Sequence, residues 1–179
     1  MSESIDHLFT EATRARLEQR FGDAKRDLTE AVNTCRKSKD QRRLARALAA
    51  LGQIERDLHN EEVALHLYEE SVEIYRALND ALKLAHKLRH VADILREMGR
   101  LPPAAAAYVE ALRIYHDHAD TQLLDLANAV RGFALLKEAL GENAEARALW
   151  EEAGILYAEV SVEAGVAESA RRVVLLGRE

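Results

Sequence analysis

Small and bulky apolar residues recur at fixed positions along this 179-residue chain. Four stretches share an alanine, a bulky residue, a second small residue and then a tyrosine or cysteine, in the same order and at the same spacing. The four columns are Ala24, Ala64, Ala104 and Ala146; Leu28, Tyr68, Tyr108 and Trp150; Ala31, Ser71, Ala111 and Ala153; and Cys35, Tyr75, Tyr115 and Tyr157. A period of roughly 40 residues predicts a supersecondary unit that buries its apolar face by stacking on its neighbours. The last offset, from Ala104 to Ala146, is slightly longer than the other two.

A second set of apolar positions precedes each alanine column. It consists of Leu8, Leu48, Leu88 and Val130, followed four residues later by Ala12, Gly52, Ala92 and Ala134. Spacings of three, four and seven residues are typical of one face of a helix. The pattern therefore predicts helices at residues 3–18, 21–37, 40–58, 61–77, 80–98, 102–117, 120–140, 143–160 and 163–176.

The expected helix boundaries carry residues that favour turns and caps. Three glycines lie near expected turns, where a left-handed backbone favours glycine: Gly22, Gly99 and Gly141. Three aspartates recur with the period of the repeat and are expected to cap helix N-termini: Asp40, Asp80 and Asp120. Pro102 and Pro103 are expected in the first turn of a helix, where a missing N–H costs little.

The chain resembles a tetratricopeptide repeat (TPR) array. The resemblance rests on four columns: Gly52, Ala92 and Ala134; Ala64, Ala104 and Ala146; Tyr68, Tyr108 and Trp150; and Ser71, Ala111 and Ala153. The longer period is similar to the kinesin-light-chain type of repeat. The resemblance implies an all-α, right-handed α-solenoid of four helix-turn-helix repeats in a single domain over residues 1–179. The repeats are expected at about 3–38, 39–78, 79–118 and 119–160.

The last expected helix, at 163–176, continues the pattern of a first helix one period further along the chain. Ala170, Val173 and Leu176 align with Val130, Phe133 and Leu136. No second helix follows, so we expect this segment to be a capping helix that covers the last repeat.

Charge and composition exclude several functions. The formal net charge is −6, with 31 acidic and 25 basic residues, so a phosphate backbone would be repelled and nucleic acid is not an expected partner. The N-terminus has neither a basic stretch nor an apolar run, and no segment is apolar enough to span a membrane. We expect a cytoplasmic protein without a membrane partner. Cys35 falls in a packing column and is expected to be a buried, inert thiol.

The sequence offers little for catalysis or metal binding. His86 and His90 have the spacing of two metal ligands on one helix, but no third ligand lies nearby in the sequence, and His116 and His118 are equally incomplete. There is no glycine-rich phosphate loop and no nucleophile beside an evident base. We therefore predict no catalytic residue, no metal and no cofactor.

The TPR resemblance implies that the first helices line a concave face that binds a peptide of a partner protein. The expected contacts are Arg46, Gln53, Arg56, His86, Arg89, Asp93, Arg96, Asn128 and Arg131, with Ala49 and Leu135 beside them. Arginine recurs in register on this face, and guanidinium groups bind carboxylates through charge-assisted bonds. This pattern favours an adaptor that binds an acidic segment or a C-terminal carboxylate.

Two alternatives stay open from the sequence. The arginines could instead pair with Asp57, Asp93, Glu97 and Glu138 in a solvated network, because exposed ion pairs need no ligand. The chain would then be a structural module that assembles through an exposed end or its convex face. The oligomeric state is not determined by the sequence.

Overall fold

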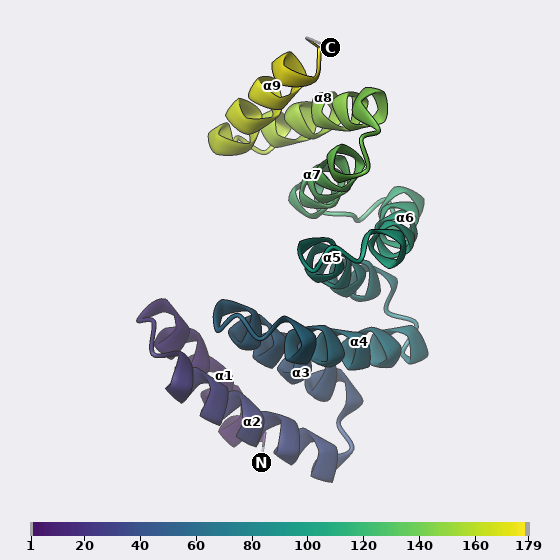
Figure 1. Cartoon of the computed structure of the whole chain (residues 1–179). Coiled ribbons are helices and arrows are strands. Elements are labelled where there is room, and N and C mark those ends of the chain that lie inside the picture. Colours follow the sequence, from purple (N-terminus) through teal and green to yellow (C-terminus); the bar gives the residue numbers. More distant parts are fainter. Residues whose placement is uncertain (1, 178–179) are drawn as a thin grey trace. The chain divides into compact units, whose positions relative to one another are not determined.

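The computed structural model describes residues 2–177, with side chains from residue 4 onward. Within residues 2–177 the chain forms nine α-helices and no strand (Figure 1). The helices are α1 (Ser2–Leu17), α2 (Phe21–Ser38), α3 (Gln41–Asp57), α4 (Glu61–Ala77), α5 (Ala81–Glu97), α6 (Leu101–Asp117), α7 (Leu123–Ala139), α8 (Asn143–Glu159) and α9 (Glu163–Leu176). The all-α prediction is confirmed, and most helix ends lie within one residue of their expected positions.

One connection is longer than the rest and explains the longer offset before the last repeat. Helix α7 begins at Leu123 with Gln122 as its N-cap, so the prediction that Asp120 caps this helix is wrong. Before it, His118 is extended, and the Thr121 hydroxyl donates a hydrogen bond of 2.7 Å to the Tyr115 carbonyl. The extra residues are used in this loop, which shifts the helix start away from Asp120.

The other two predicted aspartate caps are present. The Arg43 amide donates to the Asp40 carboxylate at 3.0 Å, and the Lys83 amide donates to Asp80 at 3.4 Å. Each carboxylate thereby satisfies an amide that has no partner in the first turn of its helix. The prolines also lie in the first turn of α6, as predicted.

The remaining seven connections share one turn geometry. Each contains one residue with φ between 53° and 75°: Gln19, Lys39, His59, Asn79, Gly99, Gly141 or Ser161. The amide of this residue bonds the carbonyl three positions back, and the next amide bonds the carbonyl five positions back, which is a Schellman-type helix end. The prediction of a turn at Gly22 is wrong, because Gly22 lies in the first turn of α2 and Gln19 takes the left-handed conformation.

The chain divides into two compact units, Met1–Lys87 and Leu88–Glu179, with the boundary inside α5. The expected single domain, the count of four repeats and the right-handed superhelix stay predictions.

The core of the first unit is formed by α1, α2 and α3. Phe9 and Ala12 of α1 pack with Leu28 of α2 and with Leu48 and Ile54 of α3. Cys35 belongs to the same cluster and is fully buried. Burial raises the pKa of the Cys35 thiol, so its reactive thiolate form is disfavoured.

The second unit repeats this packing with larger aromatic residues. Ala127, Val130 and Ala134 of α7 pack against Trp150 and Tyr157 of α8. In both units together, all sixteen residues of the four repeated columns are at most 4% exposed. The columns predicted from the sequence are therefore confirmed as the packing surface.

Glycine allows close helix contacts at three positions. A Cβ atom at Gly52 would lie 3.0 Å from the ring of Tyr68, which confirms the predicted close approach of α3 and α4. Gly132 and Gly165, which the sequence did not single out, are tighter: a Cβ atom would lie 2.6 Å from the Tyr108 hydroxyl and 2.5 Å from the ring of Tyr157, respectively. Backbone without a side chain is required at both places.

Helix α9 packs against α8 (Figure 1). Gly165 and Ser169 are buried, and Val173 and Leu176 pack against the core of the unit. Ala170, which aligns with the buried Val130, is exposed instead. Within the described chain no helix follows α9, so nothing covers Ala170 in the way that α8 covers Val130.

Candidate partner-binding site

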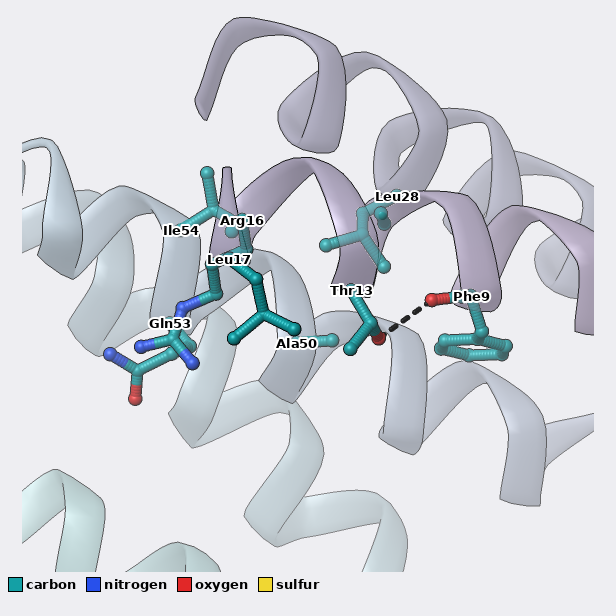
Figure 2. Close-up of a pocket in the computed structure, with 9 residues that line it drawn as sticks. Phe9, Thr13, Arg16, Leu17, Leu28, Ala50, Gln53 and Ile54 are labelled. Atoms are coloured by element: carbon teal, nitrogen blue, oxygen red, sulfur yellow. Dashed lines mark hydrogen bonds between the residues drawn. The ribbon is translucent and has the colours of Figure 1, made fainter. Parts of the chain in front are cut away.

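The first unit contains a recess of about 170 Å³ between α1 and α3 (Figure 2). Its lining is mostly apolar, and the residues are Phe9, Ala12, Thr13, Arg16, Leu17, Leu28, Ala50, Gln53 and Ile54. Helix α1 supplies the longest row, at Phe9, Thr13 and Leu17, because residues four apart share one side of a helix. These three residues lie outside the repeated columns, and their spacing was the sequence signal for this surface.

Two side chains of α1 give the recess its apolar character. The Thr13 hydroxyl donates a hydrogen bond of 2.8 Å to the Phe9 carbonyl within the same helix, as Figure 2 shows. This bond satisfies the hydroxyl without a ligand. Leu17 is 81% exposed, so a large apolar side chain lies at the open edge of the recess. Apolar surface beside a concave recess is typical of a place where another molecule binds.

A polar cluster closes one end of the recess, where Arg16 and Gln53 lie side by side in Figure 2. The Arg16 Nε donates to one Asp57 oxygen at 2.5 Å, and the Gln53 amide donates to the other at 2.9 Å. Burial acts to raise the pKa of Asp57, but the hydrogen bonds from Arg16 and Gln53, with the nearby charge of Arg56, outweigh it and the pKa is lowered. Asp57 is therefore held as a carboxylate.

Arg46 lies over Phe9 beside the opposite end of the recess, although it is not one of the residues that line it. The Arg46 guanidinium carbon lies 4.1 Å from the centroid of the Phe9 ring, a cation–π arrangement. Arg46 also lines a second, adjoining recess of about 450 Å³ together with Phe9, Thr13 and Leu17. Among the described residues, no carboxylate lies within ion-pair distance of Arg46. Its N–H groups are thus the most available cationic donors at this site.

In the second unit, Asp93 is the centre of a buried polar cluster. It accepts hydrogen bonds from Arg89 at 2.7 Å and from the Tyr108 hydroxyl at 2.5 Å. Asp93 is 9% exposed, so this predicted contact residue is largely enclosed by its own helix and α6. Burial, together with the charge of Asp93, raises the pKa of Tyr108. Tyr108 is therefore a neutral donor to Asp93.

The predicted contacts on α7 are also bonded within the unit. Asn128 accepts a hydrogen bond of 2.8 Å from the Tyr157 hydroxyl. Arg131 donates to both oxygens of Glu168 on α9, at 2.7 and 3.0 Å. This pair raises the pKa of Arg131 and lowers the pKa of Glu168. The sequence did not foresee Glu168, because its position depends on how α9 packs.

The other predicted residues make contacts outside these clusters. Arg96 donates to Glu97 at 3.2 Å, and His86 lies 3.3 Å from the Lys87 ammonium. Leu135, expected on the concave surface, packs against the core of the second unit, and Ala49 is buried. Within the residues that the structure describes, no three His, Cys, Asp or Glu side chains are grouped closely enough to hold a metal ion.

Two further carboxylates are bonded to residues that the sequence did not indicate as their partners, although Glu138 itself was considered as a partner for the arginines of the inner face. Glu55 of α3 is 3% exposed and is held by Lys25 at 2.8 Å and by Asn60 at 2.8 Å. Glu138 of α7 accepts hydrogen bonds from Trp150 at 2.5 Å and from Arg172 at 2.9 Å. Over residues 2–177, no helix is long and apolar enough to cross a membrane.

The family is decided by a match over most of the chain. A family model for the soluble NSF attachment protein, SNAP, matches residues 2–124. The chain belongs to the SNAP family. No curated protein sequence matches this SNAP-family chain.

Solved structures show the fold of this SNAP-family protein. The apo form of RapI is similar with a TM-score of 0.85 at 14% identity, covering 93% of this chain and 60% of RapI. A STAND protein with a tetratricopeptide repeat sensor from Pyrococcus horikoshii gives 0.86 at 19% identity, covering 96% of this chain and 26% of that one. A kinesin light chain with TPR-like repeats from Podosopora anserina gives 0.80 at 16% identity, covering 98% and 88%. The chain therefore has the TPR-like helical-repeat fold that its sequence resembles.

Proposed function

We propose that this SNAP-family chain is a cytoplasmic, non-enzymatic adaptor that binds an acidic segment of a partner protein on its first helices. The family name describes a protein that attaches to another protein. The TPR-like fold supports a protein-binding scaffold, although a fold alone does not identify a partner. The recess between α1 and α3 is the proposed contact.

The observation that carries the proposal is an apolar recess with Arg16 at one end and Arg46 beside the other, over the Phe9 ring. Arg16 follows Phe9, which lies beneath Arg46, by seven positions, a rise of roughly 10 Å along α1. A polyproline II segment rises about 3.1 Å per residue with three residues per turn, so it covers that distance in about three residues and places the first and fourth side chains on the same side. The fitting ligand has two carboxylates three positions apart and an apolar side chain between them.

The two cations differ in how easily they accept a ligand. Arg46 lies over the Phe9 ring and forms no ion pair with a carboxylate among the described residues, so a ligand carboxylate gains charge-assisted bonds there without displacing another acid. Arg16 is paired with Asp57, but its side chain is 46% exposed. Exposed ion pairs contribute little, so Arg16 exchanges partners at small cost. Gln53 and Arg56 are the proposed neighbouring donors.

In the second unit, the proposed anion contacts are Arg89, Arg96 and Arg131. Each has a carboxylate within its own unit, at Asp93, Glu97 and Glu168, respectively, so a ligand acid must compete for them. Polar contacts with the partner segment are proposed for Asp93 and Asn128 in this unit and for His86 in the first unit. These contacts are secondary to Arg46, because only Arg46 needs no exchange.

A defined peptide tests the proposal. The acetylated, amidated peptide Glu-Leu-Ala-Glu is titrated into the full chain and followed by amide NMR shifts, with Gln-Leu-Ala-Gln as the neutral probe. We expect shifts at Thr13 and Ala50 for the acidic peptide and an affinity that falls as salt screens the charges. The same peptide with a free C-terminus measures whether a terminal carboxylate binds more tightly.

Arginine variants identify the anion contact. Arg46→Gln is expected to weaken binding of the acidic peptide by roughly tenfold, because charge-assisted hydrogen bonds are lost. Arg42→Gln is the matched control, since Arg42 lies on the same helix, pairs with Asp80 and, unlike Arg46, lines neither this recess nor the adjoining one. Equal binding of the neutral peptide, or equal affinity of the Arg46 variant and wild type, would exclude this function.

A further inference from the structure

Helix α2 contributes Leu28 to the lining of the recess between α1 and α3 (Figure 2). The other residues of the same sequence column are aromatic: Tyr68, Tyr108 and Trp150. A leucine side chain is shorter than a tyrosine side chain. The space next to Leu28 is therefore space that an aromatic ring could occupy.

The second unit shows where an aromatic ring lies when the chain supplies one at this position. The residues that correspond to Leu28, Thr13 and Ala50 of the recess are, in the same order, Tyr108, Asp93 and Gly132. The Tyr108 hydroxyl donates a hydrogen bond of 2.5 Å to Asp93, and a Cβ atom at Gly132 would lie 2.7 Å from the Tyr108 ring. The tyrosine ring therefore fills the place between α5 and α7 that corresponds to the recess.

Tyr68 of α4 is arranged in the same way within the first unit. Its hydroxyl donates to the Gln53 side-chain oxygen at 3.4 Å, and a Cβ atom at Gly52 would lie 3.0 Å from its ring. Gln53 precedes Tyr68 by 15 positions, and the residue that precedes Leu28 by the same distance is Thr13. Leucine has neither a ring nor a hydroxyl, so α2 does not fill the space beside Thr13.

The recess has the size and the lining that one aromatic ring requires. Its volume is about 170 Å³, and a cavity of roughly 150 Å³ with leucine, isoleucine and phenylalanine in its walls binds benzene. The same three residue types line this recess, at Leu28, Ile54 and Phe9. A single six-membered ring therefore fits the recess.

We propose that the acidic segment bound at this site carries an aromatic residue between its two carboxylates, and that the aromatic ring enters the recess. The ring would take the place that the Tyr108 ring takes in the second unit. Phenylalanine is the simplest side chain that supplies such a ring. This inference rests on the proposed function, because it names the side chain that the same ligand places between Arg16 and Arg46.

The charges beside the recess favour an acidic segment as the source of the ring. Arg16 lies at one end of the recess, and Arg46 lies over the Phe9 ring beside the other. Carboxylates on either side of the aromatic residue gain charge-assisted bonds from these two cations. The ring itself gains an aromatic contact with Phe9, and pairs of rings attract each other beyond the apolar area that they bury.

Two acidic peptides that differ in one side chain test the inference. Acetylated, amidated Glu-Phe-Ala-Glu and Glu-Leu-Ala-Glu are titrated into the full chain, and methyl NMR shifts are recorded. The phenylalanine peptide is expected to bind about tenfold more tightly, because its ring buries more apolar area than leucine and contacts Phe9. Its ring current should also shift the methyl signals of Leu28 and Ile54, which the leucine peptide cannot do.

Variants that fill the recess locate the ring. Leu28→Tyr supplies a ring from within the chain, so the two peptides should bind this variant equally. Ala50→Leu fills the recess from α3 and should give the same result, which keeps the test decisive if Leu28→Tyr does not fold. Ala77→Leu is the matched control, because Ala77 lines a different recess of the first unit. This control should keep the preference for phenylalanine, and melting curves identify the variants that fold.

The possible outcomes separate this inference from the proposed function. Equal affinity of the two acidic peptides for the wild-type chain would overturn the inference and leave the proposed function standing. A preference for phenylalanine that persists in the folded recess-filling variants would also overturn it, because the ring would then bind elsewhere. Equally tight binding of Gln-Phe-Ala-Gln, with the same methyl shifts, would place the ring in the recess but contradict the proposed function. Failure of both acidic peptides to bind would overturn the two together.

Discussion

The Tyr108 hydroxyl donates a hydrogen bond of 2.5 Å to Asp93 beneath the backbone of Gly132. This bond joins α6 to α5, and Gly132 brings α7 against it. A Cβ atom at position 132 would lie 2.6 Å from the hydroxyl and 2.9 Å from the Asp93 carboxylate. The close packing of α5, α6 and α7 at this point therefore depends on the absence of a side chain at position 132.

Gly132→Ala is predicted to lower the stability of the chain by roughly 1–3 kcal/mol, because the methyl group overpacks a buried hydrogen bond. Gly22→Ala is the matched control: Gly22 is also helical, but a Cβ atom there meets nothing within 4 Å. Alanine at position 22 should raise stability by about 0.5–1 kcal/mol. Chemical denaturation measures both, and equal effects would contradict the close contact at Gly132.

Glycine substitution at the left-handed turns should stabilise the chain. Ser161 has φ 56°, and a left-handed conformation costs a residue with a side chain roughly 1–2 kcal/mol. Ser161→Gly is therefore expected to raise the melting temperature. Asn79→Gly should have a smaller effect, because asparagine tolerates this conformation. Thermal melts that show no gain for Ser161→Gly would mean that this turn carries no such strain.

The pair of Arg131 and Glu168 predicts a pH dependence in the attachment of α9. The hydrogen bond from Arg131 lowers the pKa of Glu168 below its usual value near 4.5. A carboxylate with a lowered pKa in the folded state contributes stability above its unfolded pKa and loses it as the pH falls through the folded pKa. Wild type should therefore lose more stability than Glu168→Gln between about pH 5 and 3. Parallel pH profiles of the two proteins would contradict this.

Cys35 should react with a thiol reagent only when the chain unfolds. The side chain is fully buried, and burial raises the pKa of its thiol. Labelling with a disulfide reagent at pH 8 should be slow in buffer and rapid in denaturant. Ser38→Cys in a Cys35→Ser background is the control, because Ser38 is exposed on the same helix; it should be labelled rapidly in both conditions.

The helical fold and its packing columns could be predicted because each is a local periodicity. Ala24, Tyr68 and Trp150 are buried as their columns require. Asp120 was assigned wrongly, because extending the regular spacing of the aspartates ignored the longer connection before α7. Gly22 was assigned wrongly, because a glycine near a turn was preferred to Gln19, which adopts the strained conformation.

The partners of the charged residues could not be predicted in the same way. Arg131 was recognised as a surface cation, but its bond to Glu168 depends on the packing of α9 against α8. Arg46 was expected on the inner surface, yet its contact with Phe9 joins two helices through a residue outside every repeated column. Which side chains pair across two helices depends on how each helix is rotated about its axis against the other. The periodicity of the sequence does not determine that rotation.

The recurrence of one turn geometry at Gln19, Lys39, His59, Asn79 and Gly99, at a constant spacing along the chain, makes these junctions interchangeable. A segment cut at two such turns, for example after Lys39 and after Asn79, is a cassette with matching ends. Such a cassette could be duplicated or removed without any new junction having to evolve. The connection between α6 and α7 is the exception, because its geometry differs. A segment cut within this connection would have matching ends only if its second cut lay in another loop of the same geometry.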